Sequence, residues 1–249
     1  MQFLQALYAL TKRNVILRYK HSLIGFLWGF VKPILYLFIF IVIFSAQFSS
    51  TDRYVLYTMS GLIFWFFFSN LSAQGTQSVI SASGIIKSIR IPTILFPLAE
   101  CLAELFHFLL ALLIFFIVMQ WFGLNWSPVL FWTIPILLIF VCFSLGWTLI
   151  LSALHVYFRD VGILWNTIQP ALFYLTPIAY TKELIPLKFQ YIIRLNPLFD
   201  LMQLVRAPLY DGIAPNPELL VHCTLLSVCS LLAGIFIFQS LRNQFITAI

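Results

Sequence analysis

Five stretches of this chain carry no charged residue, and each is long enough to cross a lipid bilayer as a helix. They are 19, 33, 54, 21 and 23 residues long and cover residues 33–51, 54–86, 105–158, 161–181 and 219–241. A helix crosses the roughly 30 Å hydrocarbon layer with about 20 apolar residues. Because hydrophobic residues make up 62% of the chain and charged residues only 9%, too few charged groups remain to cover the surface of a soluble domain. We therefore expect an integral membrane protein.

Two of these stretches have to be divided. Residues 72–84, in the second stretch, are rich in Ser, Gly and Gln and are too polar to lie in lipid. The third stretch is interrupted by the turn-forming residues 123–128, so it holds two crossings. Strands are disfavoured because the stretches are continuously apolar rather than alternating. The sequence predicts an all-α polytopic membrane protein, a single transmembrane domain over residues 1–249, with six transmembrane helices at about 27–48, 54–73, 98–120, 129–153, 163–181 and 219–240.

The positive charges favour one orientation of these helices. Six crossings place both termini on one side, and that side holds nine lysines and arginines against five on the other. Positive charge is retained on the cytoplasmic side of membranes, so we expect both termini in the cytoplasm. The net charge of +6 follows from this topology and gives no support for nucleic-acid binding.

Few patterns for catalysis or metal binding are present. None of the ten glycines is followed by Lys, so the phosphate loop of ATP-binding proteins is absent. All four cysteines fall inside predicted crossings, where we expect neither disulfides nor a metal cluster. Glu100, Glu104 and His107 share one face of the third crossing, but a di-iron site needs a second Glu-x-x-His, which this sequence lacks. We expect these groups to face the bundle interior, paired with Arg or Lys.

Three segments outside the crossings contain further helical patterns. Residues 1–22 predict a helix in the cytoplasmic interface, and a solvated basic tail is the alternative. Residues 74–97 predict a cytoplasmic loop with a short amphipathic helix over 83–91, whose exposed isoleucines favour a partner surface over a simple connector. Residues 182–217 predict two short external helices, over 187–195 and 198–207. Pro170 and Pro177 are expected to kink the fifth crossing.

Aromatic residues make up 18% of the chain and allow two interpretations. Most of those in the crossings are expected to pack in the bundle or face lipid. Aromatic rings also bind the apolar faces of sugars, so a glycan path is the second interpretation, and the sequence alone leaves both open. The candidate path residues are Trp28, Tyr36, Trp65, Phe66, Phe173 and Tyr174.

Several short motifs resemble those of a known family. They are RYKHSLIGFLW (18–28) leading to Pro33, GLIFWFFFSN (61–70), FRD (158–160), TPIAY (176–180) and NP (196–197). In this order and spacing, over about residues 10 to 210, they resemble the membrane subunits of ABC type-2 polysaccharide exporters, which export O-antigen, capsule or teichoic-acid polymers. Lys32, which precedes Pro33, departs from the family pattern.

The resemblance implies a division of labour between chains. In such families two permease copies form a channel, two copies of a separate ATPase bind beneath it, and the cargo is a polysaccharide on an undecaprenyl-diphosphate lipid. ATP and Mg²⁺ then belong to the partner subunit, and no cofactor is expected on this chain. The resemblance makes 1–22 the interface helix near the headgroup gate, 186–208 the external gate helices and 84–91 the coupling helix that enters the ATPase. The coupling residues are then Gly84, Ile85, Ile86, Lys87, Ser88, Ile89 and Arg90.

We therefore expect a non-enzymatic conduit in the bacterial inner membrane, surrounded by membrane lipid, with O-antigen as cargo and capsule or teichoic-acid polymers as alternatives. Basic residues near the inner interface are expected to guide the lipid diphosphate: Arg13, Arg18, Lys20 and Lys32. For Lys32 the simpler alternative is that its amino group only snorkels to the interface.

Two other functions stay open at this point. A membrane enzyme acting on polyprenyl-linked sugars would need acidic residues near an interface, and the candidates are Asp160, Asp200 and Asp211, which share no motif. An exporter of drugs or small lipids is the second alternative.

Overall fold

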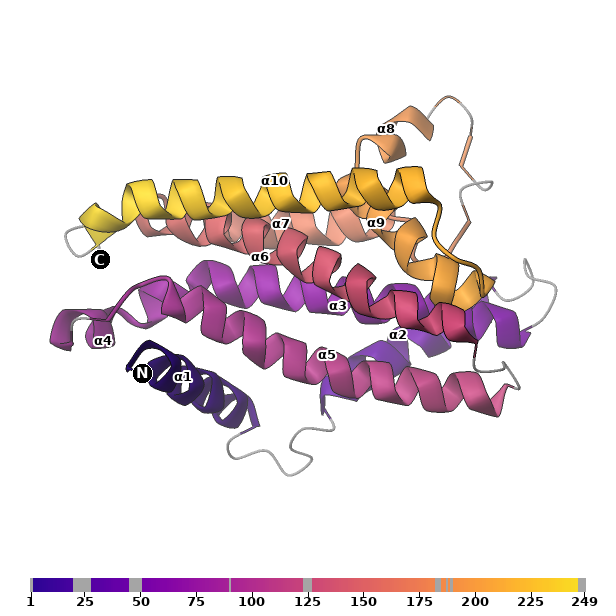
Figure 1. Cartoon of the computed structure of the whole chain (residues 1–249), viewed down its shortest axis with the longest axis horizontal. Coiled ribbons are helices and arrows are strands. Elements are labelled where there is room, and N and C mark those ends of the chain that lie inside the picture. The colour runs from indigo at the N-terminus through magenta and orange to yellow at the C-terminus, as the bar shows by residue number, and fades with distance from the viewer. Residues whose placement is uncertain are drawn as a thin grey trace.

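The structure, a computed structural model, describes residues 2–19, 28–44, 51–89, 91–122, 127–181, 185–186, 188 and 190–245. All regular elements in these parts of the chain are helices, which confirms the all-α prediction. The longer helices run side by side along one axis (Figure 1). In chain order the elements are α1 (Gln2–Tyr19), α2 (Trp28–Phe44), α3 (Thr51–Ser81), α4 (Ser83–Ser88), α5 (Leu95–Trp121), the 3-10 helix η3 (Pro128–Trp132), α6 (Thr133–Tyr157), α7 (Asp160–Leu175), α8 (Gln190–Arg194), α9 (Pro197–Arg206), the π-helix η6 (Ala207–Asp211), α10 (Pro217–Leu241) and the 3-10 helix η7 (Arg242–Gln244).

The two ends of the bundle carry different elements (Figure 1). The start of α1, the short helix α4 and the end of α10 lie at one end, which we call the terminal end. Helices α8 and α9 and the start of α10 lie at the opposite end, which we call the far end.

Helices occupy all six positions at which crossings were predicted, but they differ in length. Four helical stretches of the described chain are long and apolar enough to span a membrane: Tyr54–Ser88, Leu95–Trp121, Pro128–Tyr157 and Pro217–Gln244. Helix α2 has 17 residues and α7 has 16, so both are shorter than these four. The structure therefore supports four crossings by length and composition, and the count of six stays a prediction.

Helix α3 is longer than the predicted crossing over 54–73. Its 31 residues correspond to about 46 Å at 1.5 Å per residue. The prediction of a loop beginning at 74 was wrong because the small polar residues there satisfy their hydroxyl groups within the helix. The Thr76 hydroxyl donates to the Ser72 carbonyl at 2.5 Å, and the Ser78 hydroxyl donates to the Gly75 carbonyl at 2.7 Å. The polar half of α3 thus continues the apolar half as helix, with Thr76 and Ser78 buried and Gln74 and Gln77 exposed.

Aromatic side chains join α3 to its neighbours in the centre of the bundle. The ring of Phe64 lies edge-on to Phe108 of α5, with centroids 4.8 Å apart, and to Phe140 of α6, at 5.1 Å. These rings belong to one large apolar cluster. A second, smaller cluster at the terminal end joins α1 to the bundle through Leu10, which packs among residues such as Phe96 and Phe238.

Helices α6 and α10 approach each other most closely at two glycines. A Cβ atom placed on Gly146 would lie 2.4 Å from the backbone of Ser230, and one on Gly234 would lie 2.4 Å from the carbonyl oxygen of Gly146. Small residues let helix backbones approach this closely in membrane proteins.

Helix α7 ends at Leu175, six residues before the predicted end of the fifth crossing. A residue before proline avoids the helical conformation, and Thr176, with φ −100° and ψ 122°, is extended. Pro177 therefore ends α7 rather than kinking it, while Pro170 lies inside the helix. Residues 176–179 stay buried although they are not helical.

The segment between α7 and α10 contains two short helices, as predicted. Helix α9 begins at Pro197 and is capped by Asn196, whose side chain accepts from the Leu198 amide at 3.1 Å. One face of α9 is packed into the bundle rather than lying on its surface, through Leu201, Leu204 and their neighbours.

Candidate functional site

Five of the seven predicted coupling residues, 84–88, lie in α4, directly after α3. Helix α4 ends at Ser88 rather than 91. Ile86 is buried, so the expectation that the isoleucines are exposed is wrong for this residue: it packs in the cluster that contains Leu10 and Phe96. Lys87 is exposed and Ile89 is 56% exposed.

The other members of this set are placed as follows. Gly84 is exposed and has open space beside it, Ile85 is half-buried and Ser88 is exposed. The hydroxyl of Ser88 donates to the Gly84 carbonyl at 2.8 Å. Arg90 lies outside the described residues. Helix α4 thus presents the cation Lys87 to its surroundings, and Ile89 directly after it presents an apolar side chain.

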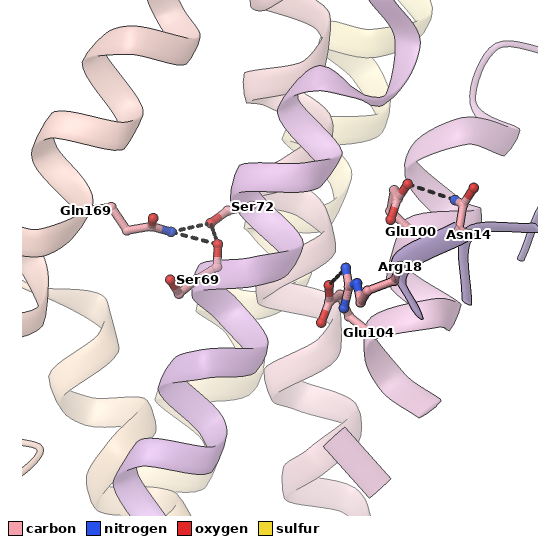
Figure 2. Close-up of polar contacts among 7 residues, drawn as sticks. All are labelled: Asn14, Arg18, Ser69, Ser72, Glu100, Glu104 and Gln169. Atoms are coloured by element: carbon pink, nitrogen blue, oxygen red, sulfur yellow. Dashed lines mark hydrogen bonds and ion pairs between the residues drawn. The ribbon is translucent and has the colours of Figure 1, made fainter. Parts of the chain in front are cut away.

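Polar side chains of α1 contact the carboxylates of α5 (Figure 2). Arg18 forms an ion pair with Glu104 through Nη2 and Oε1. The side chain of Glu104 is 2% exposed and that of Arg18 is 27% exposed. Asn14 donates from Nδ2 to Oε1 of Glu100 at 2.8 Å. The predicted pairing of these carboxylates with Arg or Lys is confirmed for Glu104, whereas Glu100 is bonded to an amide.

The structure describes the side chains of only two of the four predicted basic residues, Arg13 and Arg18. Arg13 donates to the side chain of its neighbour Asn14, at 3.1 and 3.2 Å. Lys20 and the side chain of Lys32 lie outside the described residues. Helix α1 also exposes apolar side chains such as Leu4 and Tyr8, as expected for a helix in a membrane interface.

Most of the predicted path residues pack against each other. Tyr36 lies edge-on to Phe66 and Phe173, with centroids 5.5 and 5.7 Å apart, and Trp65 lies 5.3 Å from Phe173. Trp65, Phe66 and Phe173 are buried within the chain and Tyr36 is half-buried. Tyr174 is 69% exposed.

The packing interpretation therefore applies to Trp65, Phe66 and Phe173. Among the path residues whose side chains are described, Tyr174 alone is exposed. The side chain of Trp28 lies outside the described residues.

A polar contact between α3 and α7 was missed by sequence reasoning (Figure 2). Gln169 donates from Nε2 to the Ser69 carbonyl at 2.7 Å and to the Ser72 hydroxyl at 3.2 Å. The indole of Trp165 donates to the same hydroxyl at 3.0 Å. A glutamine in an apolar helix needs such partners, so its position was the available signal. Beside it on α7, Asn166 and Thr167 are exposed.

A second missed arrangement lies at the far end, where side chains bind the non-helical residues after α7. Arg206, Tyr54 and Tyr57 donate to the carbonyls of three consecutive residues, 178, 179 and 180. We call these three side chains the carbonyl clamp. Burial lowers the pKa of the Arg206 guanidinium, and the charge of Asp211 opposes this shift. Arg206 was counted only as an external basic residue; an arginine within an apolar stretch was the signal for burial.

The three acidic candidates for an enzyme do not meet. Asp160 begins α7 at the terminal end, whereas Asp200 and Asp211 lie in α9 and η6 at the far end (Figure 1). Oδ2 of Asp200 lies 3.2 Å from Nε2 of His222. This placement gives no support for joint catalysis.

Comparison with known proteins gives one consistent answer. Residues 5–210 match the family model described as ABC-2 type transporter. The chain is 30% identical over 241 residues to an O-antigen export system permease protein RfbA of Klebsiella pneumoniae, covering 96% of this chain and 93% of the relative. It is 28% identical to RfbA of Myxococcus xanthus, covering 100% and 96%. It is 25% identical to the capsule polysaccharide export inner-membrane protein CtrC of Neisseria meningitidis serogroup B, covering 87% and 84%.

Proposed function

Because this chain belongs to the ABC-2 type transporter family, we propose that it is the membrane subunit of an ATP-driven exporter of a lipid-linked polysaccharide. The observation that carries this proposal is the similarity to O-antigen export permeases over 96% of the chain. O-antigen is the proposed cargo; capsule polysaccharide is the alternative suggested by CtrC, and teichoic acid is a further one. The carrier lipid is proposed to be undecaprenyl diphosphate.

The energy for export is proposed to come from other chains. The sequence holds no phosphate loop, so ATP and Mg²⁺ would bind to a separate subunit. We propose that two copies of this chain assemble with two ATP-binding subunits in the bacterial inner membrane, with both termini in the cytoplasm. The terminal end of the bundle then faces the ATP-binding subunits, and the far end faces outward.

Helix α4 is the proposed contact with the ATP-binding subunit. It follows α3 directly, and its exposed Lys87, together with Ile89 just after the helix, offers a cation and an apolar side chain to a cleft. Ile86 is buried against the bundle, so it would anchor α4 and transmit force rather than enter the partner.

The polysaccharide path is proposed to follow the exposed face of α7. Asn166, Thr167 and Tyr174 are exposed on this helix, and polar groups in a membrane segment face water or protein rather than lipid. Two copies that turned these faces together would enclose a path with hydrogen-bonding groups and one aromatic ring for the sugars. Trp65 and Phe173, which are buried, would stiffen its wall.

The basic residues near α1 are proposed to guide the diphosphate of the carrier lipid. Arg13, Lys20 and Lys32 remain in this proposal. Arg18, which is bound to Glu104, would hold α1 against α5 and keep its own charge near the entrance.

A strain that lacks this chain tests the proposal. Lipid-linked polymer should accumulate on the cytoplasmic side, and its sugars would identify the cargo. The purified chain should hydrolyse ATP only together with its ATP-binding subunit. Normal polymer at the cell surface without this chain, or ATP hydrolysis by the chain alone, would contradict the proposal.

A further inference from the structure

The non-helical segment after α7 is held by side chains at consecutive backbone positions. The Ile178 carbonyl accepts from Arg206 Nη2 at 2.8 Å, the Ala179 carbonyl from the Tyr54 hydroxyl at 3.0 Å and the Tyr180 carbonyl from the Tyr57 hydroxyl at 2.9 Å. Non-helical backbone within an apolar bundle requires such partners, because no water is present to replace them. The carbonyl clamp therefore fixes the path of this segment.

Arg206 connects the clamp to α3 in a second way. Its guanidinium carbon lies 3.7 Å from the centre of the Tyr57 ring, a cation–π contact that is strengthened by burial. Gly61, one turn further along α3, leaves the space for it: a Cβ atom there would lie 3.0 Å from Arg206 Nη2 and 3.2 Å from Ile178 Cγ2. Arg206 of α9 thus touches both α3 and the segment after α7.

A further hydrogen bond ties the same segment to the start of α9. Asn196 donates from Nδ2 to the Thr176 hydroxyl at 2.8 Å. The clamp and this bond together join the end of α7, the start and end of α9 and the first turns of α3. Because all these partners except the half-buried Tyr180 are buried, separating the elements would leave several unpaired polar groups in an apolar environment.

The opposite end of α3 leads into the proposed coupling helix. Helix α3 is continuous from Thr51 to Ser81, and α4 begins at Ser83. The clamp side chains Tyr54 and Tyr57 lie near its start, so one continuous helix of about 46 Å connects the clamp with α4 (Figure 1). Rigid secondary elements are one of the structures that carry coupling between distant sites, and α3 is the element that links α4 to the clamp.

We propose that Arg206 is a positioning residue that makes α9 and η6 move with α3 when α4 is displaced by the ATP-binding subunit. This inference rests on the proposed function. Without Arg206, α3 still moves and Tyr54 and Tyr57 still hold residues 179 and 180 to it, but α9 and η6 no longer follow, and the outer end of the path does not respond to ATP.

Distances between spin labels test this inference in the full chain, reconstituted in nanodiscs with its ATP-binding subunit. The four native cysteines are replaced by serine. One label pair, at Ile213 and Trp121, reports on the far end, and another, at Ser81 and Asn243, reports on the terminal end; all four positions are exposed. In the unmodified chain, ATP with a hydrolysis-deficient partner should change both distances.

In Arg206→Met the terminal-end change should persist and the far-end change should be lost. Arg242→Met, at an exposed arginine of η7, is the matched control and should keep both changes. A full far-end change in Arg206→Met overturns the inference. If neither distance in the unmodified chain responds to ATP, the proposed function fails, and the inference fails with it.

Tyr57→Phe covers the case in which Arg206→Met does not fold. It keeps the ring beneath Arg206 and removes the hydroxyl that binds the Tyr180 carbonyl and interacts with the Arg206 side chain. Its far-end change should be smaller than that of the unmodified chain. A folded Tyr57→Phe chain with an undiminished far-end change would overturn the inference.

Discussion

Gly146 of α6 and Gly234 of α10 lie backbone against backbone, so that neither position has room for a Cβ atom. We expect Gly234→Leu to force the two helices apart and to destabilise the bundle by about 1–3 kcal/mol or more, as overpacking does elsewhere. Thermal unfolding of the detergent-solubilised chain measures the effect. Ala233→Leu, at the exposed neighbouring position, is the control and should unfold like the unmodified chain. Equal unfolding temperatures for both variants would contradict the close approach.

Arg18→Met should be more harmful than the loss of both members of its ion pair. The single change leaves the carboxylate of Glu104 buried without a counter-charge, which costs about 3–5 kcal/mol in comparable cases. Arg18→Met combined with Glu104→Gln should recover most of this loss, because no uncompensated charge then remains. Unfolding of the two single variants and the double variant gives the coupling energy. Additive losses in that cycle would show that the pair contributes nothing beyond its separate members.

Lys87→Glu together with Arg90→Glu should uncouple ATP hydrolysis from export while the chain still folds. Lys87 is exposed, so its charge can be reversed without a burial penalty. Export of polymer and co-purification of the ATP-binding subunit measure the effect. Ile86→Ala provides a contrast: this side chain is buried, and its truncation should lower stability by about 2–5 kcal/mol. Unchanged export in the double charge reversal would argue against α4 as the contact.

Two adjacent aromatic residues of α7 should respond differently to truncation. Phe173 is buried and packs against Tyr36, Phe40 and Trp65, so Phe173→Ala should cost about 3–5 kcal/mol of stability. Tyr174 is exposed, so Tyr174→Ala should leave the unfolding temperature unchanged and slow export. Export at the normal rate in Tyr174→Ala would remove this ring from the proposed path.

The sequence was sufficient to locate the helices because the lengths of uncharged runs and the positions of turn residues depend on local composition alone. It was not sufficient to define where they end. The end of α7 at Leu175 depends on Pro177 and on partners such as Arg206, which donate to the carbonyls of the buried residues that follow the helix. The extension of α3 through Thr76 and Ser78 depends on hydroxyl groups that bond to carbonyls of the same helix. Composition alone shows only that these residues are polar.

For the candidate site, too, the residue types could be read from the sequence, but their contacts and burial could not. The sequence indicated that Glu104 needs a cation, but only the packing of α1 on α5 identifies Arg18. Tyr36, Trp65 and Phe173 share a cluster, but their burial could not be distinguished from exposure to a channel by residue type. Arg206 was visible as a charge, whereas its contact with Tyr57 joins residues far apart in the sequence.

The carbonyl clamp has a consequence for chimeric permeases. A swap of residues 182–217 between relatives with different cargo would transplant Arg206 but leave Tyr57, whose ring it contacts, behind in the donor. In such a hybrid the buried Arg206 would lack its contact on α3, even if an alignment placed every exchanged residue in a surface loop. A viable exchange must therefore include the beginning of α3 as well.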